Sequence, residues 1–202
     1  MMKLDYLFPR PVFHSEPDFD VSRLKAFYNK IRELDETGTR QSNVGGWQSN
    51  LINIDEHETT RDFRDVVEEN INSMLGEFGI VRARFKMSAM WLNCNINDNT
   101  NSDHIHGPAF LSGTYYIKVP EPLEETEDGA LVIADTFDQQ YYKSAFLGCC
   151  DQPTHLSAFS TSYVPEEGKL IIFSSNQIHR VRPTYVNEER ISTSFDFDLE
   201  YF

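Results

Sequence analysis

The chain has 202 residues, among them 15 Phe, 9 Tyr and 2 Trp, so it can bury the core of one domain and is not a disordered polymer. Its formal net charge of −14 disfavours a nucleic-acid partner, because an acidic surface repels phosphates. Three cysteines, two of them adjacent, make a poor disulfide framework. No apolar run reaches the ~20 residues of a membrane-spanning helix, and the first residues do not resemble a signal peptide. We therefore expect a soluble, cytoplasmic protein with no membrane partner.

The first 80 residues are predicted to be largely helical. Residues 6–19 carry three prolines among aromatics and should run extended along a sheet edge. Apolar residues at three-and-four spacing predict two helices, at 20–38 and 59–79, each ending at a glycine. Leu34 is expected to be the last apolar residue on the buried face of the first helix. The segment between them, 42–54, should be a glycine-marked loop leading into a strand.

The remainder of the chain is predicted to be mainly β. Short β-rich runs alternate with turns, which is typical of a sandwich or barrel, and helices that precede such a body usually pack on one of its faces. The acidic stretch 121–129 should be a solvated hairpin loop. Residues 135–162 form a long irregular segment, which we expect to be a lid or mobile loop that shapes substrate choice. The fold class is therefore α+β: mainly β with N-terminal helices.

Two histidines two residues apart, His104 and His106, stand in a polar run before a strand-like segment. Side chains at i and i+2 of an extended segment point to the same side, so both could hold one metal ion. His179, at the start of a later strand, is the candidate third ligand and would leave coordination positions open for substrate or oxygen. The pair alone is weak evidence, and three imidazoles would also suit Zn(II). Asp103 is a further candidate, although its side chain should point away from the pair. The other histidines are expected to be structural or exposed: His14, His57 and His155.

An arginine and a serine share one face of the last predicted strand. Arg190 and Ser192 are two residues apart, and Arg190 follows His179 by eleven residues. A guanidinium grips a carboxylate at two points, and a serine hydroxyl can bind the same group. An arginine directed into a β core needs an anion, because an unpaired buried charge is costly. An Asp or Glu of this acidic chain is the alternative partner.

From about Trp91 to Phe197, the order of these motifs resembles the 2-oxoglutarate (2OG) and Fe(II)-dependent oxygenases. The similarity is greatest to a group of small 2OG-Fe(II) oxygenases from bacteria and phages that have prolyl-hydroxylase-like motifs. Four separated segments carry the resemblance: "GGWQSN", "WLNCNI", "HIHGPAFLSGTYYIKVPE" and "ERISTSF". The resemblance implies a double-stranded β-helix (jelly-roll) core flanked by two or more helices. We expect a single such domain over 1–202, with helical support in 1–80 and the jelly roll in 81–202.

The resemblance also implies the chemistry. It indicates an enzyme, a dioxygenase with Fe(II) as its metal and 2OG as cosubstrate, which couples oxidative decarboxylation of 2OG to succinate with hydroxylation of a substrate. The metal would be held by the three histidines, and the far carboxylate of 2OG by Arg190 and Ser192. Asn93, eleven residues before His104, resembles a 2OG-contacting asparagine. Tyr115 or Tyr116 would add a hydroxyl, and only one of them can face the site. No catalytic residue is expected beyond these ligands.

The sequence departs from the superfamily at one position and leaves several alternatives open. His106 stands where a carboxylate is usual, so either His106 is a ligand or another oxygen completes the site. The alternatives to a 2OG oxygenase are a cupin-like three-His enzyme that does not use 2OG, and a non-catalytic jelly-roll binding module. A purely structural metal is disfavoured, because structural zinc sites usually have four protein ligands. The substrate, a protein or peptide residue or a small molecule, is not specified, and the Pro-rich arm could take part in a homodimer.

Overall fold

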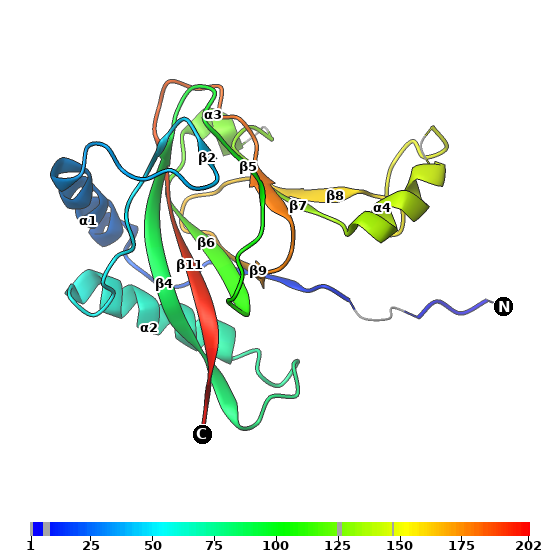
Figure 1. The fold of residues 1–202 in the computed structure, drawn as a ribbon, viewed down its shortest axis with the longest axis horizontal. Coiled ribbons are helices and arrows are strands. Elements are labelled where there is room, and N and C mark those ends of the chain that lie inside the picture. The colour runs from blue at the N-terminus through cyan, green and yellow to red at the C-terminus, as the bar shows by residue number, and fades with distance from the viewer. Residues whose placement is uncertain (1, 6–8, 125–126, 147) are drawn as a thin grey trace.

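A computed structural model of the chain describes residues 2–5, 9–124, 127–146 and 148–202. Its strands form two antiparallel sheets (Figure 1). Side chains from both sheets line one cavity. The larger sheet has the order β1 (Val12–Ser15), β9 (Leu170–Ser174), β6 (Leu111–Lys118), β11 (Arg190–Tyr201), β4 (Ala83–Asn95) and β3 (Trp47–Gln48). The smaller sheet has the order β2 (Asn43–Val44), β5 (Thr100–His104), β10 (His179–Val181), β7 (Leu131–Ala134) and β8 (Ser160–Tyr163). Strands β4 to β11 follow the jelly-roll order, so the predicted mainly β fold with flanking helices is confirmed.

Residue alternation along β11 gives the larger sheet one apolar and one polar face. The apolar side chains of β11 join the core on the outer face: Ile191, Phe195 and Phe197. The intervening side chains line the cavity on the inner face: Arg190, Ser192, Ser194 and Asp196. The outer face therefore holds the fold together, while the inner face is free to carry polar groups.

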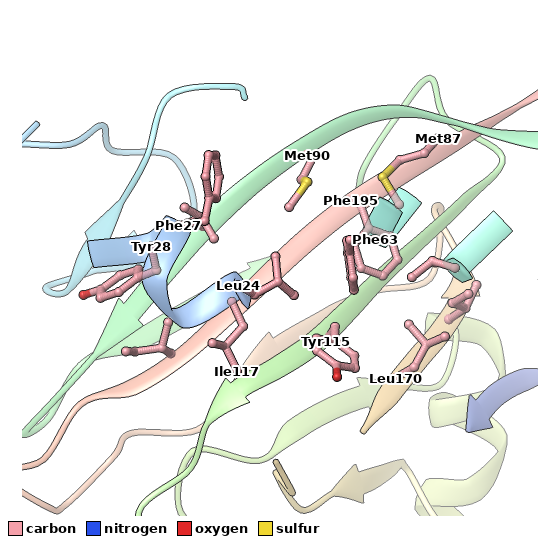
Figure 2. Packing of buried hydrophobic residues seen from close by; sticks show 14 of the residues in the cluster. Leu24, Phe27, Tyr28, Phe63, Met87, Met90, Tyr115, Ile117, Leu170 and Phe195 are labelled. Carbon is pink, nitrogen blue, oxygen red and sulfur yellow. The ribbon is translucent and has the colours of Figure 1, made fainter. Parts of the chain in front are cut away.

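Two helices cover the outer face of the larger sheet, α1 (Val21–Leu34) and α2 (Glu58–Asn72). They lie together beside β4 in Figure 1, and their apolar side chains meet those of the sheet in Figure 2. Leu24 of α1 and Phe63 of α2 are fully buried, and the Phe63 ring packs against Phe195 with centroids 5.9 Å apart. Burying side chains of this size contributes about 1.5–3 kcal/mol each. A second apolar cluster lies between the two sheets and includes Phe173.

Both helices end earlier than their sequence pattern predicts. The first ends at Leu34, which is 77% exposed and so does not belong to the buried face. Gly38 has another role: its φ is +66°, and a Cβ there would lie 2.5 Å from the carbonyl oxygen of Gln48. This glycine therefore permits a close approach of two backbone segments instead of ending a helix. The second helix ends at Asn72, and the apolar stripe continues through turns up to Gly79.

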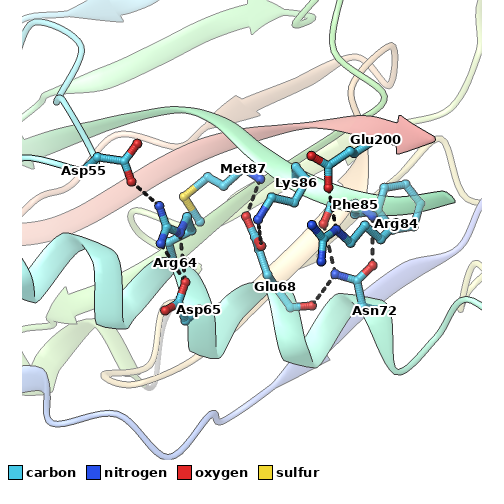
Figure 3. A network of polar contacts seen from close by, with 10 residues as sticks. All are labelled: Asp55, Arg64, Asp65, Glu68, Asn72, Arg84, Phe85, Lys86, Met87 and Glu200. Atoms are coloured by element: carbon cyan, nitrogen blue, oxygen red, sulfur yellow. Dashed lines mark hydrogen bonds and ion pairs between the residues drawn. The ribbon is translucent and has the colours of Figure 1, made fainter. Parts of the chain in front are cut away.

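Side chains near the end of α2 pair with the free edge of β4 (Figure 3). The Asn72 amide donates to the carbonyl oxygen of Phe85 at 2.9 Å, and its oxygen accepts from the Phe85 N–H at 2.8 Å. Glu68, which is 8% exposed, accepts from the Met87 N–H at 2.9 Å and from the Lys86 ammonium at 2.7 Å. An open strand edge needs such partners, since its backbone groups are otherwise unpaired.

The loop between the helices differs from its prediction. Residues 42–54 form two short strands, β2 and β3, joined by Gly45 and Gly46, and the chain beyond Gln48 is not a strand. Both glycines have positive φ, which allows the tight link between strands of different sheets.

The N-terminal arm runs along a sheet edge, as predicted for the part that the structure describes. Within 6–19, β1 pairs with β9 at the edge of the larger sheet, and residues 6–8 lie outside the described residues. Among the described residues, none of the helices combines the length and apolar character that a membrane span requires.

The segments 121–129 and 135–162 contain more helix than their composition indicates. The acidic stretch 121–129 begins with the short helix α3 (Glu121–Glu124), whose Leu123 is buried, and residues 125–126 lie outside the described residues. The 135–162 segment holds α4 (Phe137–Lys143) and the 3-10 turn η1 (Ser144–Phe146), and its residue 147 is also not described. In Figure 1 the part around α4 extends away from the sheets.

Candidate functional site

Three histidines from distant parts of the sequence meet at one end of the cavity. The ring nitrogens of His104, His106 and His179 that could bind a metal lie within 4.8 Å of one another. His104 ends β5 and His179 begins β10, and the two are directly paired across these strands. Their ring centroids are 4.2 Å apart, and that of His106 lies 5.1 and 5.0 Å from them. The His-x-His spacing and the antiparallel register thus bring three imidazoles together.

The Nδ1 atom of each ring faces an oxygen that can only accept a hydrogen bond. Nδ1 of His104 lies 2.8 Å from the carbonyl oxygen of Ser102, and Nδ1 of His179 lies 2.8 Å from that of Gln177. Nδ1 of His106 lies 2.7 Å from a carboxylate oxygen of Asp196. Because these oxygens only accept, each Nδ1 carries the proton, which leaves the lone pair on Nε2. Fixing the outer nitrogen in this way is the usual means of orienting a metal-binding imidazole.

The electrostatics favour the neutral imidazole at two of the three positions. Burial, followed by the proximity of His104, lowers the pKa of His179 to about 3. Burial also lowers the pKa of His104, and repulsion from His106 adds to that effect. A neutral imidazole is the form that binds a metal, so these rings need not lose a proton near neutral pH.

A buried arginine lies on the inner face of the larger sheet. Arg190 is 2% exposed, and no described carboxylate lies within ion-pair distance of it. One guanidinium nitrogen donates to the Asn95 side-chain oxygen at 3.1 Å, whereas Nε has no partner among the described residues. Its Cζ lies 5.7 Å from the centre of the Tyr116 ring, and burial lowers its pKa. The alternative of an Asp or Glu partner is therefore not realised in the described part of the chain.

The cross-strand register aligns three further predicted residues and Gln48, which was not predicted, in a row across the inner face. Gln48 pairs with Asn93, Asn93 with Ser192, and Ser192 with Tyr116, and all four line the cavity. The Asn93 amide donates to the Ser194 hydroxyl at 3.0 Å. These four side chains continue the polar surface that begins at the buried arginine.

Of the two candidate tyrosines, only Tyr116 lines the cavity. Tyr115 points to the opposite face, where its ring packs against Phe63 with centroids 5.1 Å apart. Burial raises the pKa of Tyr115 to about 12. Its hydroxyl therefore belongs to the helix side of the sheet.

The histidines and the arginine line one cavity of about 620 Å³ between the sheets. The segment between α1 and α2 contributes uncharged polar side chains to it, including Thr39, Gln41 and Asn50. Asp103 does not join the histidine cluster: its carboxylate pairs with Arg180 at 3.2 Å. The remaining described histidines also lie outside the cluster: His14, His57 and His155.

Sequence reasoning missed several side chains that line the site, among them Asp196 and Asn95. Asp196 lies four residues beyond Ser192 on β11, so the two-residue alternation assigns it to the same inner face. Asn95 is the cross-strand partner of Arg190. The first could have been found from alternation alone, while the second requires the strand register.

Comparisons with known proteins agree with this geometry. A family model described as "Putative 2OG-Fe(II) oxygenase" matches residues 89–196, more than half of the chain. No curated protein sequence matches the chain.

Several solved structures share the fold at low sequence identity. A prolyl-4-hydroxylase from Pseudomonas putida superposes with a TM-score of 0.62 at 13% identity, covering 94% of this chain and 92% of that one. A viral collagen prolyl hydroxylase from Paramecium Bursaria Chlorella virus-1, in a 2OG complex, gives 0.59 at 14% identity, with 92% and 94% covered. HygX from Streptomyces hygroscopicus, with nickel and 2OG bound, gives 0.60 at 8% identity, with 93% and 82% covered. At such identities the likeness shows the jelly-roll fold.

Proposed function

The chain belongs to the 2OG-Fe(II) oxygenase family, with Fe(II) and 2OG as its cofactors, and from this premise we propose that it hydroxylates a substrate held in the cavity between its sheets. His104, His106 and His179 hold the metal, and Arg190 and Ser192 hold the far carboxylate of 2OG. The observation that carries the proposal is a buried guanidinium with no acidic partner among the described residues, in the same cavity as three imidazoles whose Nδ1 atoms each face an acceptor oxygen.

The donor set fits a divalent metal ion. Three imidazole nitrogens within 4.8 Å of one another could form a three-point cap on a metal ion, a ligand number typical of non-haem iron oxygenases. Within the described part of the chain the cluster has three protein ligands, the number typical of catalytic metal sites, whereas structural sites usually have four.

The surroundings of Arg190 fit a dicarboxylate. A buried guanidinium is stable only when its charge is compensated, and a carboxylate accepts two parallel hydrogen bonds from it. Nε and a terminal nitrogen form the edge suited to such a pair, and Nε is the atom without a partner among the described residues. Ser192 adds a hydroxyl from the neighbouring inward position of β11, and Tyr116 from β6 closes the site over the guanidinium.

Bound Fe(II) supplies oxygen activation coupled to the decarboxylation of 2OG to succinate. The protein contributes binding and orientation. The two backbone carbonyls and Asp196 fix the imidazole planes, and Arg190 fixes the far end of the cosubstrate. This division of roles assigns no general acid or base to the chain.

We propose that the substrate is a residue of a protein or peptide. The part of the cavity lined by the 39–51 loop offers amide and hydroxyl groups without charged side chains, which suits the hydrogen bonds of a peptide backbone. Two of the similar structures are themselves prolyl hydroxylases. A small uncharged molecule is the alternative substrate class, and a peptide library tested against a small-molecule panel separates the two.

The proposed function is tested by melting the protein alone, with Mn(II), with N-oxalylglycine (an unreactive 2OG analogue), and with both. We expect the analogue to stabilise the protein strongly only when the metal is present, because it binds metal and guanidinium together. Succinate formed from 2OG with Fe(II) and air provides the second readout. A three-His enzyme that does not use 2OG would respond to metal alone, and a non-catalytic module would form no succinate.

A further inference from the structure

The three imidazoles are oriented by two different kinds of group. His104 and His179 each bind the backbone carbonyl two residues earlier, which is a neutral acceptor within the same segment. His106 instead binds the carboxylate of Asp196, which comes from β11, 90 residues further along the chain. The structure therefore gives one ring, and only this one of the three, a charged partner.

The position of Asp196 is itself fixed by the sheet. Ser112 of β6 is fully buried, is the cross-strand partner of Asp196, and donates its hydroxyl to the same carboxylate oxygen at 2.6 Å. Trp91 packs its ring against His106 with centroids 5.4 Å apart. The pair of His106 and Asp196 is thus held by contacts from three strands of the larger sheet.

Among the described residues, the Asp196 carboxylate forms no ion pair outside the histidine cluster. Its side chain is 18% exposed, and among the described residues its ion-pair partner is His106, with no lysine or arginine. Three neutral imidazoles leave the full charge of a divalent ion uncompensated, whereas one carboxylate hydrogen-bonded to a ligand ring returns a negative charge to the site and makes that ring a stronger donor.

We propose that Asp196 is a positioning residue that supplies, through His106, the negative charge that the three imidazoles lack, and so controls how tightly the site binds its metal. The inference rests on the proposed function, since it requires His106 to be a metal ligand. It assigns to β11 a second role beside the proposed binding of 2OG at Arg190.

The test compares Asp196→Asn, Asp196→Ala and Asp103→Asn with the unmodified protein. Asparagine keeps an oxygen that can accept from His106 but removes the charge, while alanine removes both. Asp103→Asn is the matched control, because it removes the same charge one residue from His104 at a carboxylate that binds no histidine ring. The readouts are Mn(II) and Co(II) affinity by titration, the visible absorption of the Co(II) protein, and circular dichroism of the metal-free protein.

We expect Asp196→Asn to weaken metal binding by about 10- to 100-fold, the range typical of lost partners of ligand histidines, and to change the Co(II) spectrum. Asp196→Ala should weaken binding at least as much, and Asp103→Asn should stay within about 3-fold of the unmodified protein, since exposed charges are screened. The inference is overturned if Asp196→Asn binds within about 3-fold, or if Asp103→Asn weakens binding equally. Absence of metal binding by the unmodified protein would instead refute the proposed function.

Discussion

Replacing Arg190 with methionine should abolish most of the stabilisation that 2OG gives to the protein. Methionine fills a similar volume without a charge, and the ligand-free protein should tolerate it well, because Arg190 is 2% exposed and no described carboxylate compensates it. The variant therefore separates loss of the ligand from loss of the fold.

The size of the effect follows from the two hydrogen bonds that a guanidinium makes to a carboxylate. Each charge-assisted bond contributes about 1.5–3 kcal/mol, so losing both costs about 3–6 kcal/mol, or about 10²- to 10⁴-fold in Kd. With ligand at 100 times the Kd of the unmodified protein, binding stabilises the fold by about 2.7 kcal/mol. A 100-fold weaker variant retains about 0.4 kcal/mol at the same concentration. For a chain of this size these values correspond to about 5–11 °C and about 1–2 °C in Tm.

The assay is thermal unfolding with saturating Mn(II), with and without N-oxalylglycine. Arg84→Met is the matched control, because Arg84 lies on β4 of the same sheet but is 52% exposed and pairs with Glu200. The control should keep the full ligand-induced shift. If Arg190→Met keeps it as well, the guanidinium does not hold the cosubstrate and the reasoning from its burial is wrong.

Three further predictions concern the metal, the pH and the sheet edge. His104→Ala should lose the Mn(II)-induced rise in Tm, whereas His14→Ala, at an exposed position on β1, should keep it. Equal loss in both variants would exclude metal binding by the histidine cluster as the cause of the rise. The pKa of His179 is about 3 in the folded protein against an ordinary 6.5, so the unfolded chain binds the extra proton between these values. The free energy of unfolding of the metal-free protein should therefore decrease as the pH falls below 6.5, by about 1.4 kcal/mol per pH unit for this group. In His179→Gln, urea unfolding at several pH values should show a smaller decrease of this free energy per pH unit. Asn72→Ala should lower the free energy of unfolding by about 1–3 kcal/mol, because it leaves the N–H and C=O of Phe85 unpaired; an unchanged urea midpoint would show that water replaces both bonds.

Local patterns were enough to predict the class of fold and most of the polar inner face. Two-residue alternation put Arg190 and Ser192 on one side of the last strand, and the same rule extends to Asp196. The His-x-His spacing placed two imidazoles together, but the contact between His104 and His179 depends on the β5–β10 register. That register joins residues 75 positions apart, which local spacing does not specify.

The ends of the helices were the least predictable part of the fold. Apolar spacing continued past Asn72, yet the helix ends there, at a residue whose side chain pairs with the backbone of β4. Gly38 looked like a helix stop, but a conformation with positive φ is also what a close backbone approach requires. In both cases the local sequence pattern predicted the helix end incorrectly, and a residue at the observed or the predicted end contacts a distant strand.

The alternation along β11 assigns the stability of the fold and the chemistry of the pocket to different residues of one strand. Every second residue anchors the helices, and the residues between them face the cavity without contributing to that core. A substitution at an inward position such as Ser194, whose hydroxyl accepts from the Asn93 amide, therefore alters the polar contacts of the pocket and leaves the apolar contacts of the core in place. The same strand thus serves as a rigid support on its outer face and carries the polar groups of the pocket on its inner face.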